Sequence, residues 1–135
     1  MNNKISNFAS EECPMSKYLL LTNNNEVVRV SPERIVYIHS NGNCSYMILT
    51  GNEKHAFSFN LAKFEKILQE QLNSEAHILI RLGKQLIINS KYIYYINITK
   101  QEIILSDISF PAKFTLDVSR EALRKLKTDL EEDLK

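Results

Sequence analysis

Leu79-Ile80-Arg81-Leu82-Gly83-Lys84-Gln85-Leu86-Ile87-Ile88-Asn89 is the stretch from which we interpret the rest of the chain. Two apolar runs in it flank a break at Gly83-Lys84-Gln85. Because glycine adopts backbone conformations that other residues avoid, this pattern predicts a strand, a tight loop and a second strand. Arg81 and Lys84 would then lie near the loop, where cations suit contact with phosphates or base edges. The alternative is an ordinary surface loop with two solvated cations.

The composition is that of an ordinary globular protein. The 135 residues fit a single domain, in which 44% of the residues are hydrophobic and 24% are charged. No apolar run reaches membrane-spanning length, and the N-terminus lacks the apolar segment of a signal peptide. Cys13 and Cys44 lie in unlike surroundings, so we expect a reduced, cytoplasmic protein. The net charge of +1 counts mildly against nucleic acid as a partner.

The first third of the chain predicts antiparallel strands. Residues 18–30 predict a hairpin, because two β-prone runs are joined by three asparagines. Ser31-Pro32-Glu33 has the residues of a helix start, with room for one turn before a buried strand that begins at Ile35. Asn41-Gly42 is the strongest hairpin signal in the sequence, and the strand after it begins at Cys44.

Two segments change to the period of an α-helix, with apolar residues at spacings of three, four and four. These residues are Leu61, Phe64, Leu68 and Leu72 in the first segment and Leu123, Leu126, Leu130 and Leu134 in the second. Asn60 and Ser119 are the expected caps, and both apolar faces are expected to pack in the core. Arg120 and Arg124 oppose the helix dipole at the start of the second helix, a weak indication that Arg120 has an anionic ligand.

These elements together predict an α+β, β-rich domain of about nine or ten short strands and two short packing helices. Residues 93–99, 102–105 and 110–118 supply the last strands of this antiparallel arrangement. We divide the chain into a flexible leader (1–16), one domain (17–130) and an acidic C-terminal tail (131–135).

The sequence contains no recognisable catalytic or metal-binding pattern. His39, His55 and His77 do not fall at metal-ligand spacings with each other or with cysteine, and the three glycines form no phosphate-cradling loop. No pair of carboxylates lies in an apolar strand context that would shift a pKa. We therefore expect no enzyme activity, no metal and no cofactor.

The order of elements and several motifs resemble the LytTR family of bacterial DNA-binding domains over about residues 18–130. Three segments carry this resemblance in the first half of the chain. They are Ser31-Pro32-Glu33-Arg34-Ile35-Val36-Tyr37-Ile38, Ser40-Asn41-Gly42-Asn43-Cys44 and Asn60-Leu61-Ala62-Lys63-Phe64-Glu65. The family usually has an aromatic residue where this chain has Cys44.

The opening stretch also resembles the family pattern. Arg81, Lys84 and the Ile87-Ile88-Asn89 run fit it, and Val118-Ser119-Arg120 resembles the tripeptide before the family's last helix. Departures occur at three positions, where the family has an aromatic residue, His and Ser. Here these positions hold Leu79, Gly83 and Gln85.

The resemblance implies an elongated array of three antiparallel sheets whose loops enter successive major grooves of double-stranded DNA. It implies base contacts by Ser45, Tyr46, Lys84, Gln85 and Arg120. It implies phosphate contacts by Asn43, Arg81, Lys91 and Arg124, with a structural anchor as the alternative role for Arg81. Asn89 is expected to organise the backbone before Tyr92, and Tyr37 and Tyr95 are expected in the core.

The resemblance further implies a bacterial transcriptional regulator. Residues 1–16 are too few for a phosphoacceptor receiver domain, so we expect a stand-alone regulator that responds to abundance, a protein partner or a bound ligand. A homodimer on paired half-sites is one hypothesis from the symmetry of DNA. The alternative class is a β-rich interaction module that pairs an exposed strand edge with a protein. Convergence of Lys84, Lys91, Arg120 and Arg124 on one face would favour DNA.

Overall fold

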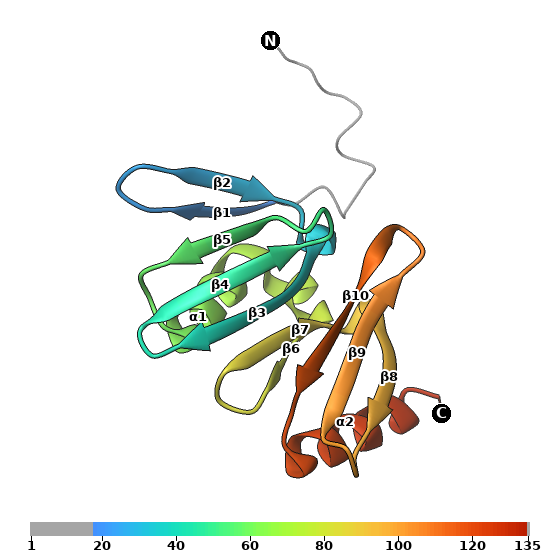
Figure 1. The fold of residues 1–135 in the computed structure, drawn as a ribbon. Helices are drawn as coiled ribbons and strands as arrows, with labels where there is room; N and C mark the ends of the chain where they lie inside the picture. Colours follow the sequence, from blue (N-terminus) through green and yellow to red (C-terminus); the bar gives the residue numbers. More distant parts are fainter. Residues whose placement is uncertain (1–17, 135) are drawn as a thin grey trace.

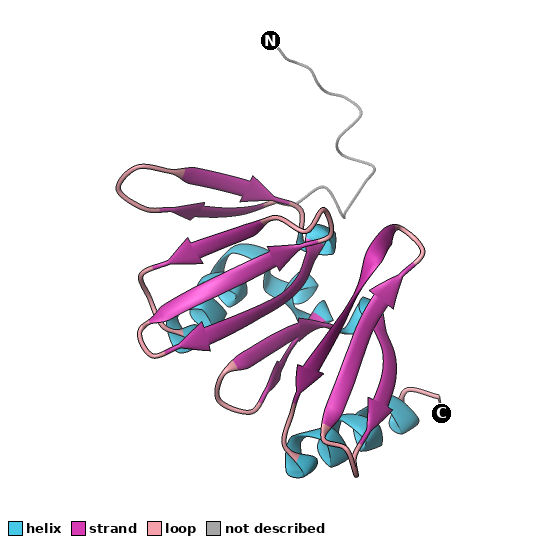
Figure 2. Ribbon diagram, viewed as in Figure 1, coloured by secondary structure: helices cyan, strands magenta, loops and turns pink. Residues whose placement is uncertain are grey.

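The computed structural model describes residues 18–134 and arranges them as ten strands and two α-helices in three antiparallel sheets (Figures 1 and 2). The strands are β1 (Leu19–Thr22), β2 (Val27–Val30), β3 (Ile35–Asn41), β4 (Cys44–Leu49), β5 (Lys54–Phe57), β6 (Leu79–Leu82), β7 (Leu86–Asn89), β8 (Ile93–Asn97), β9 (Glu102–Asp107) and β10 (Phe110–Asp117). The helices are α1 (Leu61–Leu72) and α2 (Arg120–Glu132), and short 3-10 helices are η3 (Pro32–Arg34), η4 (Asn73–Ile78) and η5 (Ser90–Tyr92). The predicted leader lies outside the described residues.

The three sheets follow one another in an elongated array, as expected. The first contains β1 and β2, the second has the order β5-β4-β3-β7-β6, and the third has the order β10-β9-β8. Figure 1 shows them succeeding one another from β1–β2 at one end to β8–β10 at the other. Strand β7 pairs with β3 although β4, β5, α1 and β6 separate them in sequence, so the second sheet joins the two halves of the chain.

Two tight turns use a glycine at positive φ. Gly42 has φ +70° and Gly83 has φ +71°, values that side chains with a Cβ rarely adopt. The register pairs Asn41 with Cys44, so the turn residues are Gly42 and Asn43, one position later than the Asn41-Gly42 pair that predicted this hairpin. Glycine thus takes the first central position of a two-residue turn.

Helix α1 covers one face of the second sheet and completes the first core. Asn60 caps it as predicted, because its side-chain oxygen accepts a hydrogen bond from the Lys63 amide at 2.9 Å. The four predicted apolar residues of α1 are buried. They pack against Leu19 and Leu21 of β1 and against the inner side chains of β3, β4 and β7. Gln71 on α1 also bonds the Leu20 backbone, accepting from its N–H at 2.7 Å and donating to its carbonyl at 2.9 Å.

Helix α2 packs on the third sheet and closes a second core. Ser119 caps it by accepting a hydrogen bond from the Ala122 amide at 3.2 Å. Leu123 and Leu126 are buried, whereas Leu134 lies beyond the helix and is 87% exposed. The apolar face of α2 is therefore shorter than the spacing of its leucines in the sequence predicts. The helix runs to Glu132, which places the first two residues of the predicted acidic tail inside it.

Asn89 organises the backbone before Tyr92, as predicted, and caps η5. Its side chain is fully buried, donates to the Ile35 carbonyl at 2.9 Å and to the Pro32 carbonyl at 3.4 Å, and accepts from the Lys91 amide at 2.9 Å. This side chain therefore fixes η5 against η3 before β8 begins.

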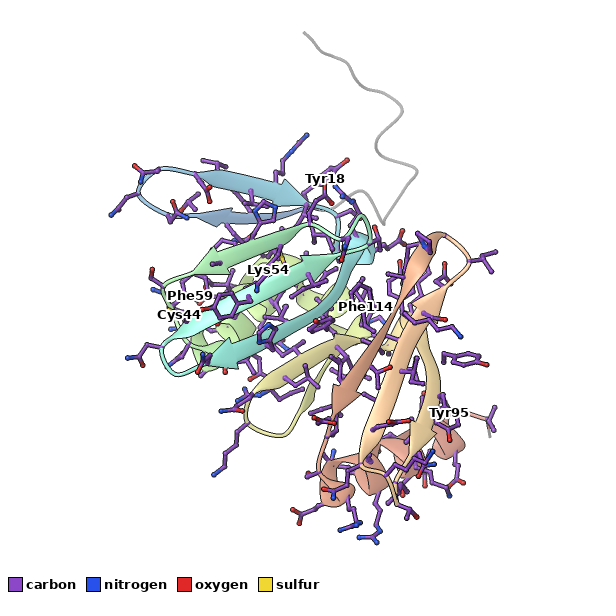
Figure 3. All side chains as sticks on the ribbon, viewed as in Figure 1. Tyr18, Cys44, Lys54, Phe59, Tyr95 and Phe114 are labelled. Carbon is purple, nitrogen blue, oxygen red and sulfur yellow. The ribbon has the colours of Figure 1, made fainter. Side chains whose placement is uncertain are left out.

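The prediction that Tyr95 lies in the core is wrong. It is 40% exposed and its neighbour Tyr94 is 65% exposed. A register shift between Ile93 and Tyr95 in the β8–β9 pairing breaks the usual alternation, so two successive side chains face solvent. Figure 3 shows Tyr95 on the outer side of the third sheet. Neither α-helix in residues 18–134 is long and apolar enough to cross a membrane.

Candidate nucleic-acid interface

Three connections lie along one edge of the array, which we call the loop edge. It consists of Gly42-Asn43 between β3 and β4, Gly83-Lys84-Gln85 between β6 and β7, and Val118-Ser119-Arg120, which leads from β10 into the first residue of α2. Figure 1 shows these connections in a row below the second and third sheets. Three segments far apart in sequence therefore lie along one edge of the molecule.

Strand pairing brings the first two connections together. Strand β3 ends where β7 begins, because the two strands are antiparallel and His39 is opposite Leu86. The Ser40 amide then donates to the Gln85 carbonyl at 3.0 Å, which ties the β6–β7 loop to the end of β3.

The third connection borders the same loop through a surface hollow. Its lining residues are Leu82, Gly83, Lys84, Gln85, Leu86, Asp117, Val118, Ser119 and Glu121. A second hollow beside it is lined by Tyr37, His39, Ser40, Gln85, Leu86, Leu116 and Asp117. Gln85 and Asp117 border both hollows, so the β6–β7 loop and the end of β10 form one continuous surface.

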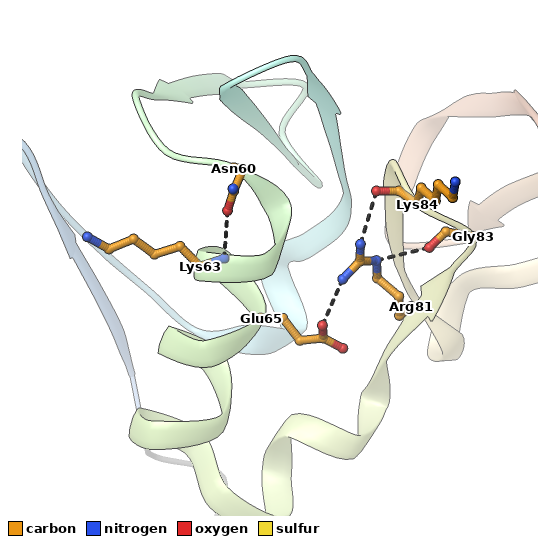
Figure 4. Close-up of polar contacts among 6 residues, drawn as sticks. All are labelled: Asn60, Lys63, Glu65, Arg81, Gly83 and Lys84. Carbon is orange, nitrogen blue, oxygen red and sulfur yellow. Dashed lines mark hydrogen bonds and ion pairs between the residues drawn. The ribbon is translucent and has the colours of Figure 1, made fainter.

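Arg81 holds the β6–β7 loop in place (Figure 4). Its guanidinium donates from Nε to the Gly83 carbonyl at 3.0 Å and from Nη2 to the Lys84 carbonyl at 3.0 Å. The remaining nitrogen, Nη1, pairs with Oε1 of Glu65 on α1 at 2.8 Å. The side chain is only 30% exposed. This geometry matches the anchoring role that the sequence left open, and a phosphate contact by Arg81 stays a prediction.

Three of the five predicted base-contact residues lie exposed on the loop edge. Lys84 and Gln85 occupy the β6–β7 loop beside Gly83, and Arg120 begins α2. The Arg120 guanidinium also donates to the Thr99 carbonyl at 3.4 Å, which orients it along this edge. Lys84 and Arg120 therefore lie on the same edge of the array, and the Arg120 guanidinium is bonded to the β8–β9 turn.

The other two base-contact predictions fall on β4 and differ from each other. Ser45 is fully buried and donates its hydroxyl to the Phe59 carbonyl at 2.7 Å, so the structure does not bring it to the surface. The Tyr46 ring is half-buried and stacks on the His39 ring, with the two ring centroids 5.1 Å apart. The Lys54 ammonium lies 4.9 Å from the centroid of the Tyr46 ring. Successive strand residues point to opposite faces, which is why the two neighbours have unlike surroundings.

The predicted phosphate contacts do not all lie at the same end of their sheets. Asn43 is exposed in the β3–β4 turn, and Arg124 is exposed one helical turn after Arg120. Lys91 precedes β8, at the end of the third sheet where the β9–β10 turn lies, whereas Arg120 follows β10 at the opposite end. An eight-residue strand such as β10 spans roughly 25 Å, so Lys91 does not converge with the other cations.

The surroundings of Lys91 are those of an ordinary surface lysine. Hydrogen bonds from Ser109 hold the pKa of the Asp107 carboxyl below its usual value, and the charge of Lys91 adds to this lowering. Lys91 thus shares its end of the sheet with a carboxylate that stays ionised.

The family model for the LytTr DNA-binding domain matches residues 25–131. This chain belongs to the LytTR family. Among solved structures, it is similar to the LytTr DNA-binding domain of a proposed methyl-accepting/DNA response regulator from Bacillus cereus, with a TM-score of 0.58 and 17% identity. The similarity covers 85% of this chain and 97% of that one. No match was found among curated proteins. The family resemblance and the three-sheet fold expected from sequence are therefore confirmed.

The LytTR fold also brings to the loop edge residues that sequence reasoning did not select. His39 and Asp117 line the hollow beside Gln85, and Lys100 lies in the β8–β9 turn next to Ser119. Burial lowers the pKa of His39, and the charge of Lys54 lowers it further, so the imidazole is neutral at pH 7. Of these three residues, only Lys100 could have been selected from the sequence, as a cation in a predicted tight turn. The positions of His39 and Asp117 beside Gln85 depend on strand pairing. Residues 18–134 hold no group of three or more His, Cys, Asp or Glu that could bind a metal.

Proposed function

We propose that this LytTR domain binds double-stranded DNA sequence-specifically, with the loop edge facing successive major grooves, and thereby regulates transcription. The observation that supports the proposal is the shared edge: Lys84, Gln85 and Arg120 lie exposed on neighbouring connections and are tied to the fold by hydrogen bonds. A reading surface needs such fixed positions, because base contacts require donors and acceptors held in register with the groove.

Each of these side chains has a base that suits its chemistry. Lys84 and Arg120 donate to O6 and N7 of guanine, and Gln85 pairs with N6 and N7 of adenine. On β4, the half-buried Tyr46 remains a candidate base contact, whereas Ser45 is fully buried and bonded to the Phe59 carbonyl. A good base contact contributes about 1–3 kcal/mol of discrimination, so two or three such contacts produce a usable specificity.

Phosphate contacts would position the domain. Asn43 is exposed in the β3–β4 turn and Arg124 one helical turn after Arg120, and both suit this role better than Arg81, whose guanidinium nitrogens are all engaged. The near-neutral net charge predicts weak non-specific binding, because that binding depends almost entirely on neutralised phosphates. A high ratio of specific to non-specific affinity therefore follows from this proposal.

The competing interaction-module hypothesis needs an open strand edge. At β1, the edge is occupied in part by the side-chain amide of Gln71, which bonds both backbone groups of Leu20. This contact leaves less of β1 for a partner strand. Charge placement also supports DNA, because Lys84 and Arg120 are exposed on neighbouring connections of the loop edge, whereas Lys91 lies at the opposite end of the third sheet.

The test is selection of duplexes from a random library by the full chain, compared with Lys84→Ala and Arg120→Ala. We expect a recurring motif whose affinity falls with salt, and a loss of about 1–3 kcal/mol in each variant with relaxed preference at one position. Two copies of the motif at a fixed spacing would indicate a homodimer on paired half-sites. No enrichment by the folded wild-type chain would contradict the proposal and favour a protein partner.

A further inference from the structure

The β8–β9 turn lies beside the start of α2 and extends the loop edge. Asn97 pairs with Glu102 on β9, and Glu102 pairs with Asp117 on β10, so this turn and the β10–α2 connection share one end of the third sheet. Figure 1 shows both at the lower end of the sheet. The Val118 amide donates to the Gln101 carbonyl at 2.9 Å. Together with the bond from Arg120 to Thr99, this contact attaches the turn to the connection that presents Arg120.

The turn itself is fixed by local hydrogen bonds. The Gln101 amide donates to the Ile98 carbonyl at 3.1 Å, and the Lys100 amide donates to the Asn97 side-chain oxygen at 2.9 Å. Gln101 adopts a positive φ of 56°, which turns the chain back into β9. The backbone of Lys100 is therefore held in a defined position relative to Arg120.

Lys100 is an exposed cation with no acidic partner among residues 18–134. The nearby lysines of α2 differ, because Lys125 pairs with Asp129 and Lys127 pairs with Glu131. A hollow lined by Lys100, Gln101, Asp117, Val118 and Ser119 separates the turn from α2. Asp117 borders this hollow without an ion pair to Lys100, so the ammonium group is available to an external anion.

We propose that the β8–β9 turn is a fourth DNA-contacting element, in which Lys100 binds a backbone phosphate next to the groove that Arg120 enters. The inference rests on the proposed DNA binding and specifies one of its contacts. A lysine is a point charge on a flexible stem, which suits a phosphate better than the fixed pattern of a base edge. The contact therefore adds affinity and places the domain, and it leaves the preferred sequence unchanged.

The experiment measures affinity of the full chain for a selected duplex over a series of salt concentrations, for wild type and Lys100→Gln. We expect the slope of log affinity against log salt to become shallower by about 0.9, as for the loss of one phosphate contact. Affinity should fall by a similar factor on a scrambled duplex, and the selected motif should stay the same. Lys113→Gln is the matched control, because Lys113 is an exposed lysine on the same sheet that rests near the Tyr94 ring.

Several outcomes would overturn the inference. An unchanged salt slope for Lys100→Gln, or equal changes of slope in Lys100→Gln and Lys113→Gln, would show that Lys100 makes no specific phosphate contact. A changed slope for Lys91→Gln, with none for Lys100→Gln, would place the DNA at the other end of the third sheet. A changed motif in Lys100→Gln would indicate base reading by this side chain. Failure of the wild-type chain to bind any duplex would instead refute the proposed function. Thermal melting of each variant identifies any loss of folding.

Discussion

At the scale of single residues, burial decides which polar side chains stabilise the fold. Asn89 is fully buried and bonds two carbonyls and one amide from separate segments. We predict that Asn89→Ala lowers the free energy of unfolding by about 2–3 kcal/mol, because buried polar groups are left without partners and water cannot replace them. Urea denaturation of the variant and wild type measures this difference.

Asn23 provides the matched control. Its side-chain oxygen accepts from the amides of Asn25 and Glu26 at 2.9 and 2.8 Å, but the site is exposed. Water can replace these bonds, so Asn23→Ala should cost less than about 1 kcal/mol. Equal losses in the two variants would show that turn geometry, rather than burial, determines the effect.

At the scale of elements, helix α1 positions the β6–β7 loop through the pair of Glu65 and Arg81. Two hypotheses for Arg81 predict opposite signs for Glu65→Gln. If Arg81 anchors the loop, losing its acidic partner loosens the loop, and specific DNA affinity falls roughly fivefold, or about 1 kcal/mol. If Arg81 instead serves as a phosphate contact, removing a nearby acid raises affinity and steepens the salt dependence.

We predict that Glu65→Gln lowers specific DNA affinity, because all three guanidinium nitrogens of Arg81 are engaged within the fold. Glu70→Gln is the control: Glu70 is exposed on the same helix, forms no ion pair within residues 18–134, and carries the same charge. Binding titrations on the selected and scrambled duplexes separate the two effects. A rise in affinity for Glu65→Gln beyond that for Glu70→Gln would contradict the anchoring role.

At the scale of the whole molecule, sequence predicts what is determined locally. The caps Asn60 and Ser119 and the turn at Gly83 were predictable because their hydrogen bonds or backbone angles involve residues within a few positions. The family resemblance supplied the three-sheet array, which periodicity alone left as a set of hairpins. Pairing of β3 with β7 is non-local, and no local pattern indicates it.

The candidate site was predicted less completely for the same reason. The family resemblance implies base contacts by both Ser45 and Tyr46, but both faces of β4 carry buried apolar residues such as Met47 and Ile48. The alternation therefore did not reveal which neighbour faces inward. The resemblance implies a phosphate contact by Lys91 and none by Lys100, because motifs do not show which end of a sheet a lysine occupies. Only the register of the third sheet separates the two.

The second sheet also couples the two cores into one folding unit. Strand β3 contributes Ile35 to the first core and Val36 to the second, and β7 contributes Ile87 to the first and Ile88 to the second. Loosening either core therefore loosens a wall of the other.

We predict that truncation in either core destabilises the whole array in a single transition. Phe64 on α1 and Leu123 on α2 are both 0% exposed and lie in different cores. Phe64→Ala should cost about 3–5 kcal/mol and Leu123→Ala about 2–5 kcal/mol, the usual range for cavities left by such side chains. Denaturation followed by far-ultraviolet circular dichroism and by tyrosine fluorescence should give coincident transitions in each variant. Separate transitions would show that the third sheet and α2 unfold independently, and the loop edge would then be held together by DNA rather than by the fold.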